Sequence, residues 1–134
     1  MVVIHVDPFP SNEELNSLWA EAWGDPEERD FRGILTRSLA HLGAYDGHRL
    51  VGFLNVATDG GLHAFILDTC VRPSMRRKGI ATMLVREATN VARDRGATWL
   101  HVDFEPHLTS FYRDCGFGPT PAGLIRLGKA FRNS

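Results

Sequence analysis

The sequence predicts an α/β (α+β) fold in which helices and strands alternate along one chain. Apolar residues recur with a period near 3.6 in some segments and near two in others, as in amphipathic helices and half-buried strands. Two glycine-containing turns separate strand-like segments in the middle of the chain. The 134 residues are 43% hydrophobic, enough for one core and too few for two ordinary domains. We therefore expect residues 1–134 to form a single domain.

Charge and cysteine content exclude several classes of protein. The net charge is −1, with 15 Lys and Arg against 16 Asp and Glu, so no bulk positive field attracts nucleic acid or an anionic membrane. Cys70 and Cys115 lie far apart, which indicates neither a disulfide framework nor a zinc ribbon. No basic leader and no apolar stretch of about 20 residues is evident. We expect a cytoplasmic protein without nucleic-acid or membrane partners.

The N-terminal part predicts one strand and two helices. Residues 2–6 form a short β-branched run typical of a strand. Ser11 and Glu14 make a capping box, and the helix that they begin is expected to end at Gly24. Residues 25–28 supply a cap, a first-turn proline and an acid for a second helix. Its apolar stripe consists of Phe31, Ile34, Leu35 and Leu39.

The middle of the chain predicts two hairpins. Residues 42–45 and 49–57 flank Asp46-Gly47, a dipeptide suited to a tight turn. Asp59-Gly60-Gly61 then leads into residues 62–71. Because this last segment is almost continuously apolar, we expect a strand that is covered on both faces.

The C-terminal part predicts a helix, a strand, a short helix and a last strand. A long helix should end at Gly96, with its apolar stripe at Ile80, Leu84, Ala88, Val91 and Ala92. Residues 98–104 alternate as in a strand. Pro106 begins a further helix that Gly116 ends, and residues 124–127 suggest a final strand.

A basic turn between a strand and the long helix is the most informative segment. Helix N-termini carry partial positive charge, so Arg76, Arg77 and Lys78 should each cost about 0.3 to 1 kcal/mol there unless an anion balances them. Gly79 and Ala81 have little or no side chain, which would let a phosphate approach the free amides. The segment is therefore typical of an anion-binding turn.

The basic turn also has other interpretations. Ser74 could cap a helix whose three cations are simply solvated on an exposed face. A nucleotide P-loop is excluded because Gly-x-x-x-x-Gly-Lys-Ser/Thr is absent, and no Gly-x-Gly-x-x-Gly fingerprint follows a strand. These two common kinds of cofactor site are therefore excluded.

Two segments resemble a known family. Residues 76–81 resemble the acetyl-CoA signature of GCN5-related N-acetyltransferases, Arg/Gln-x-x-Gly-x-Gly/Ala, and residues 111–117 are similar to the family's Phe-Tyr-x-x-x-Gly-Phe. The order of expected elements also matches, from Val2 to Leu127. The resemblance implies a mixed, mostly antiparallel sheet, splayed between its fourth and fifth strands, with helices on both faces. It implies transfer of an acetyl group from acetyl-CoA to an amine, with no metal.

The resemblance also implies where the cofactor binds. The pantetheine arm would lie between residues 62–71 and 98–104, pairing with backbone groups near Cys70 and Val71 as an added strand does. The pyrophosphate would lie on the turn formed by Arg76, Arg77, Lys78, Gly79, Ile80, Ala81 and Thr82.

For catalysis, the resemblance implies that Tyr112 protonates the departing thiolate. Tyr112 could instead be a core residue, because it shares a helical stripe with other apolar residues. Asp68 is a carboxylate within an apolar strand, where burial would raise its pKa and make it a general base. It could equally be a structural carboxylate bonded to backbone amides. Many family members have a Glu at the preceding position, which is Leu67 here.

Two further acids are candidates for binding the acceptor. Glu105 occupies a position where the family often has Asn, and it could attract a cationic amine or cap the helix that begins at Pro106. Asp103 precedes it on the expected strand. Polyamines, aminoglycosides, amino acids and protein N-termini all remain open as acceptors, and the exposed last strand would permit a homodimer.

The sequence is also compatible with two rival functions. His101 and Asp103, with a remote histidine, could form the two-histidine, one-carboxylate site of an iron oxygenase. These residues could also be an ordinary polar strand end. A non-catalytic module that only binds coenzyme A is the other alternative.

Overall fold

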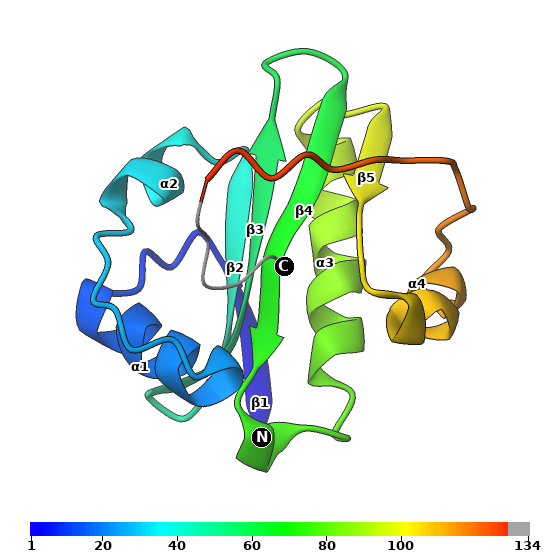
Figure 1. The fold of residues 1–134 in the computed structure, drawn as a ribbon. Coiled ribbons are helices and arrows are strands. Elements are labelled where there is room, and N and C mark those ends of the chain that lie inside the picture. Colours follow the sequence, from blue (N-terminus) through cyan, green and yellow to red (C-terminus); the bar gives the residue numbers. More distant parts are fainter. Residues whose placement is uncertain (129–134) are drawn as a thin grey trace.

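A five-stranded sheet in the order β1-β2-β3-β4-β5 forms the centre of the molecule (Figure 1). The computed structural model describes residues 1–128. Neighbouring strands are antiparallel, except that β4 and β5 are parallel. The mixed, mostly antiparallel sheet that was predicted is thereby confirmed. The strands are β1 (Val2–Val6), β2 (Ala40–Asp46), β3 (Arg49–Thr58), β4 (His63–Val71) and β5 (Trp99–Val102).

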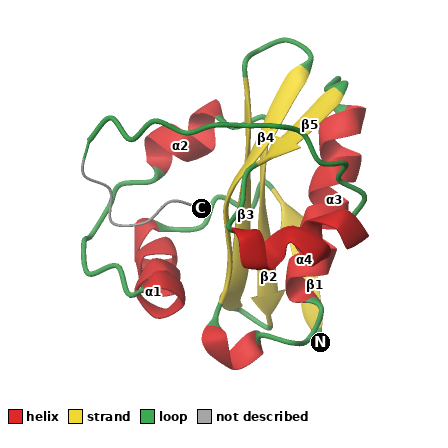
Figure 2. Ribbon diagram, turned by 45° about the vertical axis from the view of Figure 1, so that its right-hand side comes forward, coloured by secondary structure: helices red, strands yellow, loops and turns green. Residues whose placement is uncertain are grey.

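Helices cover both faces of this sheet, as expected (Figure 2). On one face, α1 (Asn12–Trp23) and α2 (Arg32–Arg37) pack over a core that includes Leu15, Trp19 and Phe53. On the other face, α3 (Ile80–Asp94) packs over an aliphatic core from all of the first four strands. Short 3₁₀ helices at Pro73–Met75 and Pro106–Leu108 precede α3 and α4 (Thr109–Asp114).

The boundaries of α1 follow from its sequence. The Glu14 N–H donates to Ser11 Oγ (3.1 Å), and the Ser11 N–H donates to the Glu14 carboxylate (3.0 Å). Gly24 ends the helix in the left-handed conformation, with φ 69°. The predicted capping box and glycine stop are both confirmed.

The second helix was predicted to begin too early. Residues 24–31 are irregular, and α2 begins only at Arg32. The Asp25 carboxylate bonds to the Glu27 N–H (3.0 Å) and to Arg29 Nε (2.9 Å). Because Asp25 stabilises this loop, it is not available to start a helix. In the first hairpin, Asp46 pairs with Arg49, so the two turn residues lie one position later than predicted.

Two predictions about strands were wrong. β4 is not covered on both faces, since Ala64 and Ile66 are buried but the Phe65 side chain is 37% exposed. Residues 124–127 form no strand, and Figure 1 shows the C-terminal segment crossing over β5 and β4. The segment has apolar, strand-forming residues, but within residues 1–128 it pairs with no strand of the sheet. A propensity for strands is insufficient without such a partner.

Candidate active site

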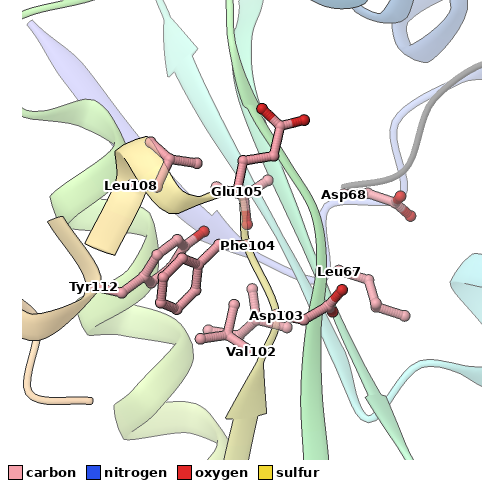
Figure 3. Close-up of a pocket in the computed structure, with 10 residues that line it drawn as sticks. Leu67, Asp68, Val102, Asp103, Phe104, Glu105, Leu108 and Tyr112 are labelled. Atoms are coloured by element: carbon pink, nitrogen blue, oxygen red, sulfur yellow. The ribbon is translucent and has the colours of Figure 1, made fainter. Parts of the chain in front are cut away.

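The parallel pairing of β4 and β5 stops halfway along β4. Ile66 pairs with Val102, but β4 continues to Val71 alongside β3 alone. The two strands are therefore splayed, as predicted. A pocket opens at this point (Figure 3), lined by Ile66, Leu67, Asp68, Thr69, Val102, Asp103, Phe104, Glu105, Leu108 and Tyr112.

A β-bulge shapes the β4 side of the pocket. Phe53 pairs with Cys70 and Asn55 pairs with Leu67, so two residues of β4 oppose one residue of β3. Asp68 is one of the two, with φ 59°, a conformation that few non-glycine residues adopt. Bulges bend a strand and redirect its side chains, and they concentrate beside active sites. The bulge thus explains why β4 leaves β5 here.

Asp68 lines the pocket, but its position differs from the expectation. The residue is only partly buried, because β4 is open on this face. In Figure 3 its carboxylate points away from Tyr112. Asp68 and Tyr112 therefore face different sides of the opening, and the burial that was expected to raise the pKa of Asp68 is only partial.

Tyr112 is both a core residue and a pocket residue. Its side chain is 5% exposed, and its ring stacks on Phe104 at 4.7 Å between centroids. Phe111 and Phe117 contact it edge-on. Burial raises the pKa of the Tyr112 hydroxyl above its ordinary value of 10.0, so the group stays protonated at neutral pH. The two interpretations of Tyr112 are therefore compatible.

The Thr69 hydroxyl lies close to Tyr112 and was not anticipated as a site residue. Its hydrogen bond with Tyr112 lowers the pKa of that residue, a smaller effect than the increase caused by burial. Thr69 Oγ1 is buried, and Tyr112 is the partner it has within the described part of the chain. Because a hydroxyl group can both donate and accept, Thr69 could also bond to a ligand atom in the pocket.

The peptide groups at the end of β4 differ in direction. The Arg72 N–H donates to the carbonyl group of Val51 on β3 (2.8 Å). Because peptide groups alternate along an antiparallel ladder, Cys70 also bonds to β3, whereas Val71 presents its N–H and C=O to the opening. The Cys70 thiol is buried against α1, and burial raises its pKa. Of the two predicted residues, only Val71 is placed to pair with an added strand.

The start of α3 has unpaired amides. Gly79 is its N-cap in the left-handed conformation (φ 76°) and offers no side-chain cap. The first helical bond joins the Met83 N–H to the Gly79 carbonyl group (3.0 Å). The amides of Ile80, Ala81 and Thr82 consequently have no acceptor among residues 1–128. Such a helix start binds anions.

The three predicted cations differ in their contacts and in the direction that they face. The Arg76 guanidinium donates to the Ala22 carbonyl group at the end of α1 (3.3 Å). Arg77 and Lys78 are exposed beside the unpaired amides, and Arg77 has φ 63°. The predicted turn is therefore present, with Arg76 directed toward α1 and the other two cations facing solvent. A solvated helix through residues 76–78 does not form, because α3 begins at Ile80.

Arg72 is a buried cation that sequence reasoning missed. It is 4% exposed, and its Nε donates to the Leu50 carbonyl group (2.7 Å). Its Nη1 lies 2.9 Å from the Glu21 carboxylate on α1. Its hydrogen bond to Glu21 is the main reason why the pKa of that carboxyl group is lowered. The sequence feature that could have identified this buried cation is an arginine directly after an apolar strand.

Asp103 and Glu105, the two acids predicted to bind the acceptor, both line the pocket. Glu105 stands at the N-cap position of the 3₁₀ helix, but its side chain makes no capping hydrogen bond. Its carboxylate is 61% exposed and lies 3.6 Å from His107 Nδ1. The capping interpretation is therefore wrong for this residue.

The residues of the rival iron site are brought together only in part, because His101 meets a remote histidine but no complete set of three ligands forms. His101 Nε2 lies 2.8 Å from His63 Nδ1, and the His101 ring stacks on Phe65. Within residues 1–128 no group of three or more His, Cys, Asp or Glu is arranged to hold a metal ion.

None of the helices in the same range combines the length and apolar character that crossing a bilayer requires.

A splayed strand pair beside an uncapped helix start has the free backbone groups that an extended, phosphate-bearing ligand would need. Residues 8–117 match the Acetyltransferase (GNAT) family. The chain belongs to this family, which confirms the resemblance predicted from residues 76–81 and 111–117.

Similar proteins agree with this membership. GCN5-related N-acetyltransferase 3, chloroplastic, of Arabidopsis thaliana is 32% identical over 125 residues, which cover 89% of this chain and 51% of that protein. Mycothiol acetyltransferase of Mycobacterium ulcerans (strain Agy99) is 32% identical over 109 residues, 78% of this chain and 33% of that protein. The chain spans less than two thirds of the length of each of these curated relatives, and about half of the Arabidopsis protein.

A solved structure matches over almost the whole chain. The GNAT family acetyltransferase SP0256 from Streptococcus pneumoniae TIGR4 superimposes with a TM-score of 0.80 at 25% identity. The match covers 97% of this chain and 100% of that one. The α+β fold predicted from sequence is therefore confirmed.

Proposed function

We propose that residues 1–134 act as one N-acetyltransferase domain, which transfers the acetyl group of acetyl-CoA to a primary amine by direct attack in a ternary complex. One observation carries the proposal: the opening between β4 and β5 contains a pocket with a protonated tyrosine, and the same strand β4 leads to an uncapped helix start. The two features suit the two ends of one extended cofactor.

The residues present fit acetyl-CoA. The Val71 peptide group faces the opening and would pair with the pantetheine arm, as a backbone pairs with an added strand. The amides of Ile80, Ala81 and Thr82 would hold the diphosphate, with Arg77 and Lys78 adding charge. Acetyl-CoA supplies an acyl group that is already activated as a thioester. The remaining work of the protein is orientation and proton transfer.

Tyr112 would act as the general acid. Its hydroxyl reaches the pocket from α4, and its raised pKa keeps the proton available for the departing thiolate. The packed rings around Tyr112 hold the hydroxyl in one place. Thr69 would bond to a ligand atom as well as to the tyrosine oxygen.

The acceptor would enter from the acidic side of the opening. Asp68, Asp103 and Glu105 line the pocket, so its mouth carries negative charge. This charge favours an acceptor that arrives as a cation and must lose a proton before it attacks. Asp68, directed away from Tyr112, would accept that proton as the general base. Acid and base would then act from opposite sides of the reacting atoms.

The test combines binding and turnover. Calorimetry should show one molecule of acetyl-CoA bound per chain, and thiol release should then depend on an added amine. Cationic amines should react with lower KM than neutral ones, and Asp103→Asn should raise that KM while leaving the acetyl-CoA affinity unchanged. Asp94→Asn, an exposed acid at the end of α3, is the matched control. Binding without turnover on any amine would support a non-catalytic coenzyme A module instead.

A further inference from the structure

We propose that His63 and His101 form a two-imidazole site for a borderline divalent transition ion, Zn²⁺ or Ni²⁺, outside the acetyl-transfer pocket. His63 Nδ1 and His101 Nε2 lie 2.8 Å apart, and the two rings have an interplanar angle of 42°. Neither residue lines the pocket. Their facing nitrogens are the atoms that ordinarily ligate such ions.

The backbone places these two imidazoles on the same face of neighbouring strands. His63 pairs with Trp99 and Phe65 pairs with His101, so the histidines project from neighbouring strands on the same face of the sheet. The N–H groups of Thr98 and Trp99 both donate to the Leu62 carbonyl group, at 2.8 and 3.0 Å. These bonds secure the start of β5 against the start of β4.

A neighbouring ring also orients His101. The Phe65 ring stacks on it with centroids 4.5 Å apart and an interplanar angle of 18°. The imidazole therefore has one face covered by a packed ring, which restricts its rotamers. A ligand that is held in place before the ion arrives loses less conformational entropy on binding.

The two imidazole nitrogens would have to move only a little to bind one ion between them. Two Zn–N bonds of about 2.0 to 2.1 Å at a tetrahedral angle separate the nitrogens by roughly 3.3 Å. The present separation of 2.8 Å would have to widen by roughly 0.5 Å, within the reach of small side-chain rotations. Without an ion, one imidazole donates its N–H to the facing nitrogen of the other.

The donor set selects the class of ion. Neutral imidazole suits Zn²⁺, Ni²⁺ and Cu²⁺, whereas Mg²⁺ and Ca²⁺ require oxygen ligands. Residues 1–128 supply no third side-chain ligand, so water would complete the coordination. The Asp59 carboxylate accepts a hydrogen bond from the backbone N–H of His63 (3.4 Å), and it adds negative charge near the two imidazoles. The ion would link β4 and β5 over the part of the strands that remains paired.

The experiment uses untagged, full-length protein and calorimetric titration with ZnCl₂, then NiCl₂, then MgCl₂. Zn²⁺ and Ni²⁺ should bind at one site per chain, and Mg²⁺ should not bind. His63→Ala and His101→Ala should each weaken Zn²⁺ binding by roughly 100-fold, because one ligand cannot chelate. His48→Ala removes an exposed histidine from the β2–β3 turn and should leave binding unchanged. Circular dichroism verifies that each variant is folded.

Imidazole NMR signals supply a second measurement. On addition of Zn²⁺, the signals of His63 and His101 should shift while those of the other histidines stay in place. The proposal is overturned by absence of Zn²⁺ binding, by wild-type affinity in either variant, or by shifts at other histidines only. Because no acetyl-CoA is present, the result is independent of the proposed acetyl transfer.

Discussion

The guanidinium group of Arg72 lies 2.9 Å from the Glu21 carboxylate, so the residue that follows β4 is connected directly to α1. The same side chain bonds to the Leu50 carbonyl group on β3. Arg72 thus joins three elements just beyond the strand that lines the pocket and just before the turn that is proposed to bind phosphate.

Arg72→Ala should destabilise the fold by about 1 to 3 kcal/mol, because it leaves the buried Leu50 carbonyl group without its donor. Urea denaturation followed by tryptophan fluorescence measures the change. Arg49→Ala is the matched control, since Arg49 pairs with the same Glu21 at 3.8 Å but is exposed. That variant should lose less than about 1 kcal/mol. Equal losses in the two variants would show that burial of Arg72 has no energetic consequence.

Gly79→Glu should abolish acetyl-CoA binding, measured by calorimetry. The new carboxylate would lie beside the unpaired amides of α3, where it would compete with the diphosphate. The control is Gly60→Glu, in the loop between β3 and β4. Gly60 also has a positive φ (85°) and open space around it, so it matches Gly79 in backbone strain and in added charge. Only the first variant should lose binding, and retained affinity in Gly79→Glu would refute a phosphate site at this turn.

Tyr112→Phe should lower kcat by roughly 10 to 1000-fold, as expected when a general acid is lost. The acetyl-CoA affinity should change little, because the ring contacts with Phe104 and Phe111 remain. Steady-state kinetics and calorimetry on the same preparation separate the two effects. A variant as fast as the wild type would leave Tyr112 as a packing residue only.

Stability should fall as the pH decreases from 7.5 to 5.5, because of His41. Burial lowers the pKa of His41 below its ordinary value of 6.5, and its Nε2 accepts the Phe9 N–H (2.9 Å), which requires the unprotonated nitrogen. The unfolded chain therefore binds a proton in this range more readily than the folded protein does. The stabilisation is complete above pH 6.5 and decreases as the pH falls below it.

Urea denaturation at several pH values measures that dependence. His41→Gln should flatten the slope of the free energy of unfolding between pH 7.5 and 5.5. His48→Gln, at an exposed histidine, should keep the wild-type slope. An unchanged slope in His41→Gln would assign the pH dependence to other groups.

Local features were predictable because they depend on residues that are close in the sequence. The capping box of Ser11 and Glu14 needs only three residues, and Gly79 adopts its positive φ because it lacks a side chain. The alternation of residues 99–102 likewise follows from the geometry of a single strand. The basic turn and the resemblance that it carries could therefore be identified from sequence.

Features that depend on distant partners were missed or wrong. Asp25 has a helix-start sequence, but its hydrogen bond to Arg29 holds a loop instead. The bulge that includes Asp68 arises from the register between two strands, which no single strand sequence specifies. Residues 124–127 have the composition of a strand but form none.

By itself, the sequence determined the capping box and glycine stop of the first helix, the position of the basic turn and the family, since each depends on short-range chemistry. Only the tertiary structure decided that Val71 rather than Cys70 faces the opening, that Arg72 is buried beside Glu21, and that His63 meets His101. These relationships join residues from different elements. Strand register and helix packing set their distances, and both are properties of the whole folded chain.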